Sequence, residues 1–450
     1  MIIKRLATTS TKHLRELFVA GLLLLIVVVP FLIQPKVPPE LEAYYCVQFR
    51  DLVGPLHVRV DCDAYRLVVL ARDPQLLLAP QEVRQSRPLF IVIGWALAKP
   101  IGILPSELVG PYSLIASYGG ALAFVPEYTG FLILNGLLLL ASTLLFRRLL
   151  GSTSLLSAWT LLPLVVLLSN QVTKLFFWTP HLQIFNIFVP VASMSLYCWM
   201  QPRLRTLTWL QVTFIGLLIG FAALIYGSFA VTAGGAALCI LVGEGISALR
   251  ERVINKSFQS FLLLASFFLP TVVWAAIVTN ITGSYYSHEI VQYRQFVWLG
   301  DSLSQGANVL LTDLSANLSK YAFTVAQVVV FPCLALAFVV AVTLAVSVSR
   351  QPDNLDQSRS FAVLLYVLPA ILFQGLMGFY QPRLSWSLVP AVLLILGLEI
   401  RQLEVALVGR ARFAVKASLI IVSAVYLAYW IFSQGPFGEV QWGRPVLEVL

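Results

Sequence analysis

Residues Asp61-Cys62-Asp63-Ala64-Tyr65-Arg66 are the most densely charged part of a polar segment in an otherwise apolar chain. The segment extends from Pro35 to Arg87 and holds seven basic and seven acidic residues. Charge beside hydrocarbon is costly unless it is paired, solvated or functional. The sequence therefore predicts a loop outside the membrane, some of whose charges form a site.

The composition on both sides of this segment is that of an integral membrane protein. Hydrophobic residues make up 59% of the 450 residues and charged residues 11%, whereas about a quarter of a soluble domain is charged. At about 20 apolar residues per helix, the chain can hold a dozen or so spans. The apolar runs are continuous and rich in Leu, Ala and Val, which favours helices. We expect the first run to remain as an anchor, because no small-residue cleavage site follows it.

We predict an all-α fold, a polytopic transmembrane helical bundle that forms one membrane domain over residues 1–450. About thirteen spans are expected, at residues 17–34, 89–104, 108–126, 129–147, 155–170, 180–199, 208–226, 229–248, 258–279, 321–348, 361–379, 384–400 and 415–433. Four basic residues precede the first span, which places the N-terminus in the cytoplasm and, by odd parity, the C-terminus outside. Including 108–126 puts 18 of the 30 Lys and Arg residues on the inner side of a plasma (inner) membrane. The net charge of +9 then needs no nucleic-acid partner.

Two long loops lie on the predicted outer side, at 35–88 and 280–320. The first carries the acidic motif, and we predict that it is helical. Its run Ala64–Leu78 is expected to form either an amphipathic helix at the membrane interface or a solvated loop helix. Short outer turns add Lys174, His181 and Arg383.

Asp61 and Asp63 are the candidates for catalysis. One of them would act as a general base that deprotonates a hydroxyl or amine acceptor for attack on a phosphate-activated carbon. The alternative is structural: an Asp that caps the following helix, with a salt bridge nearby. A leaving phosphate also needs cations opposite the base, and Arg suits phosphate through its bidentate fork. The basic residues on the predicted outer side that fit this role are Arg72, Arg84, Arg87, Lys174, Arg294 and Arg383.

Several other polar residues have both a functional and a structural interpretation. His181 is either a second base or a hydrogen-bonding residue at the end of a span. Lys174 lies among aromatic residues and either binds phosphate or extends its ammonium toward the interface. Cys46 and Cys62 share the outer loop, where an oxidising exterior would permit a disulfide; two free thiols are the alternative. No Cys or His spacing indicates a metal site. Four glycines are expected to allow close helix packing rather than to form a phosphate loop: Gly216, Gly220, Gly234 and Gly235.

Several motifs recur in a recognisable order. Asp61-Cys62-Asp63-Ala64-Tyr65 is followed by Ala71-Arg72, and the loop ends in Arg87-Pro88-Leu89-Phe90 at the start of the second predicted span. Trp178-Thr179-Pro180 begins a later span, and Tyr380-Gln381-Pro382-Arg383-Leu384 precedes a span that contains Pro390. This order resembles the GT-C superfamily of integral-membrane glycosyltransferases, which includes protein O-mannosyltransferases and the aminoarabinose transferase of lipid A.

The resemblance implies a catalytic Asp in the first outer loop, a polyprenyl-phosphate sugar donor reached from the lipid bilayer, and an acceptor at the outer face. It implies no metal and no other cofactor. The family's adjacent Asp-Glu pair is replaced by Asp61-Cys62-Asp63, which leaves open which Asp is catalytic. Only about 17 residues follow the last predicted span, so we expect a monosaccharide transferase rather than an oligosaccharyltransferase.

Three other functions stay open. A transporter or flippase of lipid-linked precursors would place polar residues at mid-membrane depth, and the candidates are Lys99, Asn135, Asn186 and Gln374. A glycan polymerase or ligase would place its key charges in a late outer loop, for which 280–320 is a modest match. A non-catalytic assembly subunit is the third alternative.

Overall fold

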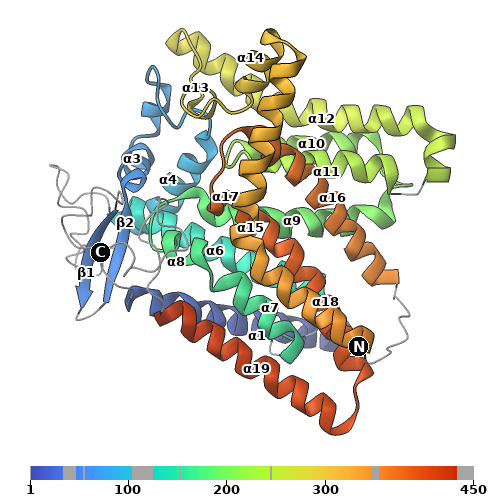
Figure 1. The fold of residues 1–450 in the computed structure, drawn as a ribbon. Helices are drawn as coiled ribbons and strands as arrows, with labels where there is room; N and C mark the ends of the chain where they lie inside the picture. Colours follow the sequence, from blue (N-terminus) through green and yellow to red (C-terminus); the bar gives the residue numbers. More distant parts are fainter. Residues whose placement is uncertain are drawn as a thin grey trace.

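The computed structural model describes residues 2–33, 47–53, 56–103, 125–152, 154–155, 157–243, 246–345 and 354–432. Within these residues the protein is a bundle of α-helices with one two-stranded hairpin (Figure 1). The predicted all-α bundle is thereby confirmed in its main feature. Among the described residues, eight helices are long and apolar enough to cross a membrane, which indicates a multi-pass membrane protein.

The spanning segments coincide with the apolar runs of the sequence. The eight long ones are formed by α1 (Ile2–Val28) with η1 (Val29–Ile33), α6 (Val125–Leu150), η4 (Leu182–Ile184) with α9 (Phe185–Met200) and η5 (Gln201–Arg203), α12 (Ile246–Thr282), α15 (Ala307–Ala345), α16 (Asn354–Met377), α17 (Pro382–Ser385) with η6 (Trp386–Leu388) and α18 (Val389–Ala406), and α19 (Gly409–Phe432). Four shorter apolar helices are α4 (Pro88–Gly102), α7 (Ala158–Leu168), α10 (Trp209–Ala223) and α11 (Phe229–Val242). The predicted span 108–126 lies almost entirely outside the described residues.

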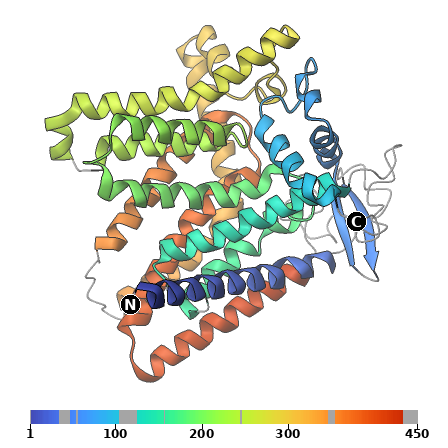
Figure 2. The same cartoon turned by 180° about the vertical axis from the view of Figure 1, so that it is seen from behind.

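The bundle has two distinct ends, which both views show (Figure 1, Figure 2). The N-terminus and the connection between α18 and α19 lie at one end, and the hairpin lies at the other. We call these the N-terminal end and the hairpin end. Helix α6 runs between them: Tyr128 donates to the carbonyl of Trp178 near its start, and Arg147 pairs with Glu16 of α1 near its finish, at 3.0 Å. Arg147 therefore lies toward the N-terminal end of the bundle.

The loop at 35–88 differs from the prediction in one respect. Its described part, from residue 47 on, starts with strands β1 (Val47–Val53) and β2 (Leu56–Asp61), which pair antiparallel with Val47 opposite Asp61. A wholly helical loop was therefore wrong. Apolar and polar residues alternate along much of both strands, a period-two pattern typical of a half-buried hairpin, and the prediction did not use it.

The helical part of this loop is confirmed but shorter than Ala64–Leu78. Helix α3 (Cys62–Arg72) begins at the cap Asp61, and the 3-10 turn η3 (Pro74–Leu78) follows it. Pro74 ends α3 because a proline lacks the N–H that a helix interior needs and disfavours helical backbone in the residue before it. Asp73 then caps η3 through the N–H of Gln75.

Three of the four predicted glycines, Gly216, Gly220 and Gly235, allow close helix packing, whereas Gly234 has only ordinary contact with Pro369. A Cβ at Gly216 would overlap the carbonyl oxygen of Leu263, and one at Gly220 would overlap that of Phe267, so α10 lies directly on the backbone of α12. Gly235 of α11 lies equally close to the hydroxyl of Tyr197. Small residues let membrane helices approach to this distance.

We expect Gly220→Ala to lower the free energy of unfolding by about 1–3 kcal/mol, because the added methyl group must push α10 away from α12. The matched control is Gly136→Ala in α6, where no atom lies within 4 Å of the new Cβ. Thermal unfolding in detergent measures both. Equal midpoints for the two variants would contradict the close packing.

Candidate functional site

The two acidic residues of the motif lie at the hairpin end, beside residues from two distant segments. The carboxylate oxygen Oδ2 of Asp63 lies 2.8 Å from Nη2 of Arg84 and 3.7 Å from Nε2 of His181. The Asp63 side chain is 52% exposed, whereas Arg84 and His181 are largely buried. The structure therefore brings together three residues that the sequence singled out, around one accessible carboxylate.

Asp61 and Asp63 have different roles in the fold. Asp61 is the N-cap of α3, and its carboxylate accepts from the backbone N–H of Asp63 at 2.8 Å. The N–H of Asp61 in turn donates to the hydroxyl of Thr179 at 3.1 Å, which ties the motif to the segment before α9. The alternative that this residue caps the following helix is therefore confirmed for Asp61. Asp63 adds the salt bridge to Arg84 and keeps half of its side chain exposed.

His181 is held as a neutral hydrogen-bond donor. Its Nδ1 accepts from the backbone N–H of Gln183 at 3.2 Å, so the proton of the neutral ring lies on Nε2, which faces Asp63. Burial, followed by the positive charge of Arg383, holds the pKa of His181 well below its usual value of 6.5. The ring also stacks against Phe176, with centroids 4.4 Å apart. At neutral pH the site thus has one neutral imidazole N–H beside its carboxylate.

Asp63 is ionised at neutral pH. Burial alone would raise the pKa of this carboxyl, but the guanidinium of Arg84, with smaller contributions from His181 and Arg383, lowers it below 3.8. An opposite charge within a few ångströms favours the charged form in this way. The base is therefore ready to accept a proton, but it is weak while Arg84 is paired with it.

Arg383 is the second arginine that faces the two carboxylates. Its guanidinium lies 5.9 Å from the ring centre of Phe176 and interacts electrostatically with both Asp61 and Asp63. The carbonyl of Arg383 accepts from the side-chain amide of Asn186 at 2.9 Å. Through these contacts Arg383 faces the two carboxylates, although it lies more than 300 residues away from them in the sequence.

Tyr226 contacts both Asn186, which holds the backbone of Arg383, and Arg87. Its hydroxyl donates to Oδ1 of Asn186 at 2.8 Å, and the guanidinium of Arg87 lies 5.6 Å above its ring. Asn186 and Tyr226 are buried. Sequence reasoning missed Tyr226, Thr179 and Phe176, which stand among many apolar residues. The available signal was Asn186 itself, a lone amide within a predicted span.

The two long loops at 35–88 and 280–320, which were predicted to lie outside the membrane, meet at this site. Arg87 pairs with Glu289 at 2.6 Å, and Ser86 donates to the same carboxylate at 2.8 Å. The side chain of Gln85 accepts from the N–H of Tyr286, and its carbonyl accepts from the indole N–H of Trp274. Residues 84–87 are thus fixed on one side to Asp63 and on the other to the start of the loop 280–320.

Three predicted phosphate-binding residues take other positions. Arg72 is exposed in the last turn of α3, nine residues and about 14 Å along the helix from Asp63. Arg294 is exposed and pairs with Asp301. Lys174, in α8 (Gln171–Phe176), is buried and donates to the carbonyl of Trp430 at the end of α19. A role in phosphate binding stays a prediction for all three.

The possible disulfide stays a prediction as well. Cys46 lies outside the described residues, and for Cys62 only the backbone is described. Cys198, Cys239 and Cys333 are free thiols within helices.

One group of side chains has the spacing of a metal site. Single donor atoms of Asp61, Asp63 and His181 all lie within 4.8 Å of one another. Carboxylate and imidazole donors suit several divalent cations. In the described arrangement Oδ2 of Asp63 is paired with Arg84 and Nδ1 of His181 is used by Gln183, so a cation would require Arg84 to move.

No family model, curated protein or solved structure matches this chain. The functional assignment therefore depends on the geometry of the site.

We expect His181→Asn to reduce the loss of stability at mildly acidic pH. The folded-state pKa of His181 lies below 6.5, so the unfolded chain binds the extra proton. The contribution of neutral His181 to the free energy of unfolding is complete above about pH 6.5. It is lost as pH falls, by at most about 1.4 kcal/mol per pH unit. Unfolding in mixed micelles between pH 7.5 and 5.5 measures this. In the control His288→Asn, the free energy of unfolding should still fall with pH at the rate that His181 causes. If wild type and His181→Asn showed the same dependence on pH, His181 would not be a buried neutral group.

Proposed function

We propose that this protein is a GT-C-like glycosyltransferase that moves a sugar from a polyprenyl-phosphate donor to an acceptor at the outer face of the plasma (inner) membrane. The observation that carries the proposal is the half-exposed, ionised Asp63 with Arg84 and Arg383 beside it, and with Arg87 three residues after Arg84 in the same turn. Such an arrangement offers a base for the acceptor and cations for a leaving phosphate.

The proposed orientation puts the N-terminal end of the bundle in the cytoplasm and the hairpin end outside. The positive-inside rule supports it, because the basic N-terminus and Arg147 share one end. Thirteen spans, with 108–126 among them, remain the proposed count. Helix α4 has 15 residues, fewer than the about 20 that a straight span needs.

The reaction proceeds by displacement at the anomeric carbon. The acceptor oxygen or nitrogen attacks this carbon while the bond from the carbon to the phosphate oxygen breaks. The acceptor proton passes to Asp63, and the polyprenyl phosphate leaves with one additional negative charge. Arg84 and Arg87 stabilise that charge, and the Nε2–H of His181 helps to orient the carboxylate.

Arg84 can couple donor binding to the basicity of Asp63. Its Nε is buried and makes no hydrogen bond to any described residue, so the guanidinium retains donor capacity for a phosphate. A phosphate that draws Arg84 away from Asp63 raises the pKa of Asp63 toward its ordinary value. The base would therefore strengthen when the donor is bound.

The transporter alternative has less support. The buried amides that suggested it are used by the fold: Asn135 donates to the carbonyls of Phe176, Phe177 and Thr179, and Gln374 to that of Leu384 and the hydroxyl of Ser387. Asn186 supports Arg383 in the same way. Lys99 is exposed and lies over the ring of Trp95.

We expect Asp63→Asn to reduce transfer by about 100- to 10,000-fold, the usual contribution of a general base. The assay measures release of undecaprenyl phosphate by protein in nanodiscs with envelope extract as acceptor. Donors are undecaprenyl-phosphate mannose, galactose, N-acetylglucosamine and aminoarabinose. Asp73→Asn is the matched control, because Asp73 only caps η3 and Asn also caps. Full transfer by Asp63→Asn would rule out the mechanism.

A second comparison separates a transferase from a polymerase or ligase. Arg87→Ala should cost about 100-fold in transfer, because it removes a cation from the leaving group. Arg294→Ala should stay within about twofold, because its guanidinium pairs with Asp301 in an exposed position. The reverse ranking, measured in the same assay on folded protein, would favour a ligase that works through the late loop.

A further inference from the structure

Three ring side chains lie together beside the charged site. The ring of Tyr293 stacks on that of Phe379, with centroids 4.4 Å apart and an angle of 20° between the planes. The imidazole of His288 packs edge to face with Tyr293, with centroids 4.9 Å apart. The next residue, Glu289, forms the ion pair with Arg87 that ties this segment to the site. We call Tyr293, Phe379 and His288 the aromatic cluster.

The aromatic cluster lies close to the carboxylates of the site. His288 interacts electrostatically with Asp63 and Arg84, and Tyr293 interacts electrostatically with Arg383. Between exposed groups such interactions are screened beyond about 10 Å. One molecule can therefore touch both the aromatic cluster and Asp63.

The backbone that carries Tyr293 has a conformation that its sequence does not favour. Arg294 and Phe296 have positive φ angles of 49° and 62°, which residues other than glycine adopt rarely and at a cost in free energy. The N–H of Phe296 donates to the carbonyl of Met377 at 3.1 Å, and the indole N–H of Trp298 donates to the preceding carbonyl of α16 at 3.0 Å. Packing against α16 therefore holds the aromatic cluster in place, and backbone strain of this kind is common at binding sites.

The edges of the aromatic cluster can form further hydrogen bonds. Nδ1 of His288 is used by the hydroxyl of Tyr286, at 3.3 Å, whereas Nε2 has no partner among the described residues. The hydroxyl of Tyr293 likewise bonds to no described residue, and Tyr293 is 38% exposed. The cluster thus offers an accessible apolar surface bordered by two hydrogen-bonding groups.

The ionised side chains around the cluster are already paired with one another: Arg87 with Glu289, Arg84 with Asp63, and Arg294 with Asp301. A neutral acceptor leaves these pairs intact, whereas a charged one competes with them. The C–H groups of a sugar ring carry a slight positive charge and pack on the negative face of an aromatic ring. The hydroxyl groups of the sugar lie at its edge, where they form hydrogen bonds. The chemistry of the cluster therefore fits a sugar ring.

We infer that the aromatic cluster binds a sugar ring of the acceptor, so that the protein transfers its sugar to a glycan rather than to a protein side chain. The inference rests on the proposed function for the reaction and deepens it by naming the class of acceptor. The ring contacts the exposed part of Tyr293, and its hydroxyl groups bond to Nε2 of His288 and to the hydroxyl of Tyr293. A hydroxyl of this ring or the next one attacks the anomeric carbon of the donor. Its proton passes to Asp63 while the bond from that carbon to phosphate breaks.

The test measures glycan binding, which does not require transfer. The probes are mannotriose, triacetylchitotriose, maltotriose and a neutral peptide rich in Ser and Thr. Saturation-transfer-difference NMR on protein in nanodiscs measures their affinities. At least one trisaccharide should bind wild type, and Tyr293→Ala should weaken its binding by about five- to tenfold, the effect of losing one aromatic contact.

Two further variants separate the ring from the rest of the segment. Tyr293→Phe keeps the ring and loses one exposed hydrogen bond, so it should weaken binding by only about two- to threefold. The matched control is Leu303→Ala in α14 (Val297–Gln305), because Leu303 is an exposed side chain of the same segment outside the cluster. It should bind the trisaccharide like wild type.

The inference would be overturned if no trisaccharide bound, or if Tyr293→Ala and Leu303→Ala had equal affinities. Tighter binding of the peptide, lost in Tyr293→Ala, would also overturn it and would assign the cluster to a protein acceptor. If Tyr293→Ala fails to fold, hydroxyl-radical footprinting of wild type decides. A trisaccharide should protect Tyr293 and Phe379 but not Leu303, and protection of neither ring would contradict the inference.

The proposed reaction and this acceptor site can fail separately. If a trisaccharide accepts sugar and Tyr293→Ala leaves its apparent KM unchanged, the transferase stands and the aromatic cluster is not its acceptor site. If trisaccharide binding depends on Tyr293 but no donor is used, the glycan site stands and the transferase is rejected.

Discussion

The site depends on buried amides that satisfy irregular backbone inside the bundle. Carbonyl groups away from water need hydrogen-bond donors, and a broken helix within a membrane protein persists only where neighbours supply them. Asn135 supplies three such bonds to residues 176–179, and Asn186 and Gln374 supply bonds to residues 383 and 384. These segments carry His181 and Arg383. Without the amides, neither side chain would have a fixed direction.

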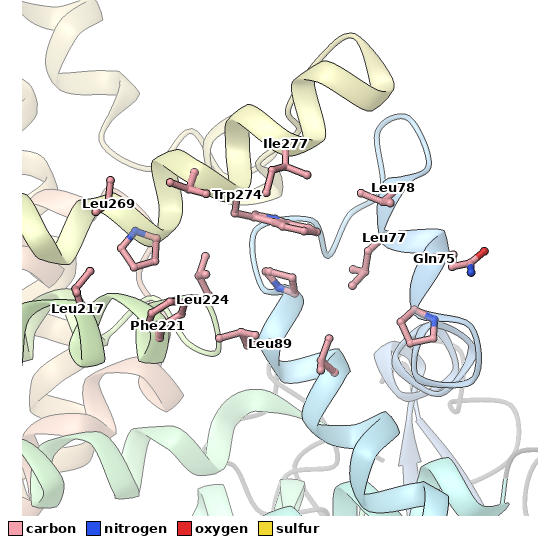
Figure 3. Close-up of a pocket in the computed structure, with 15 residues that line it drawn as sticks. Gln75, Leu77, Leu78, Leu89, Leu217, Phe221, Leu224, Leu269, Trp274 and Ile277 are labelled. Atoms are coloured by element: carbon pink, nitrogen blue, oxygen red, sulfur yellow. The ribbon is translucent and has the colours of Figure 1, made fainter. Parts of the chain in front are cut away.

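Ion pairs then join the segments that carry His181 and Arg383 to the loops at 35–88 and 280–320. Asp63 and Glu289 each take one arginine from residues 84–87, so a single turn connects the first loop to the second. Asp63 is half exposed and the other three side chains are mostly buried. Such ion pairs contribute little net stability but fix the positions of their side chains when both partners are present. Pro88 and Leu89, which directly follow this turn, line an apolar groove (Figure 3). The turn therefore holds two guanidinium groups against two carboxylates and leads into the wall of this groove.

The fold was predictable where a single physical signal dominates. Continuous apolar runs predicted the helices, and Pro74 accounts for the end of α3. The hairpin was missed because its alternation is short and lies among charges. Asp61, Asp63, Arg84 and His181 were predicted one by one from chemistry, but not their distances. Tyr226 and Phe176 were not predicted at all, since an aromatic residue in an apolar run gives no sign of which neighbour it supports.

The sequence by itself determined that this is a multi-pass helical membrane protein, because hydropathy is a local property that each segment carries alone. It also determined that residues 61–66 are polar and begin with a residue suited to cap a helix. Only the tertiary structure decided that Asp61 caps while Asp63 faces Arg84 and His181. That choice depends on the contact of Asp63 with Arg84, 21 positions away, and on contacts with Thr179 and His181, each 118 positions away, which packing alone brings together.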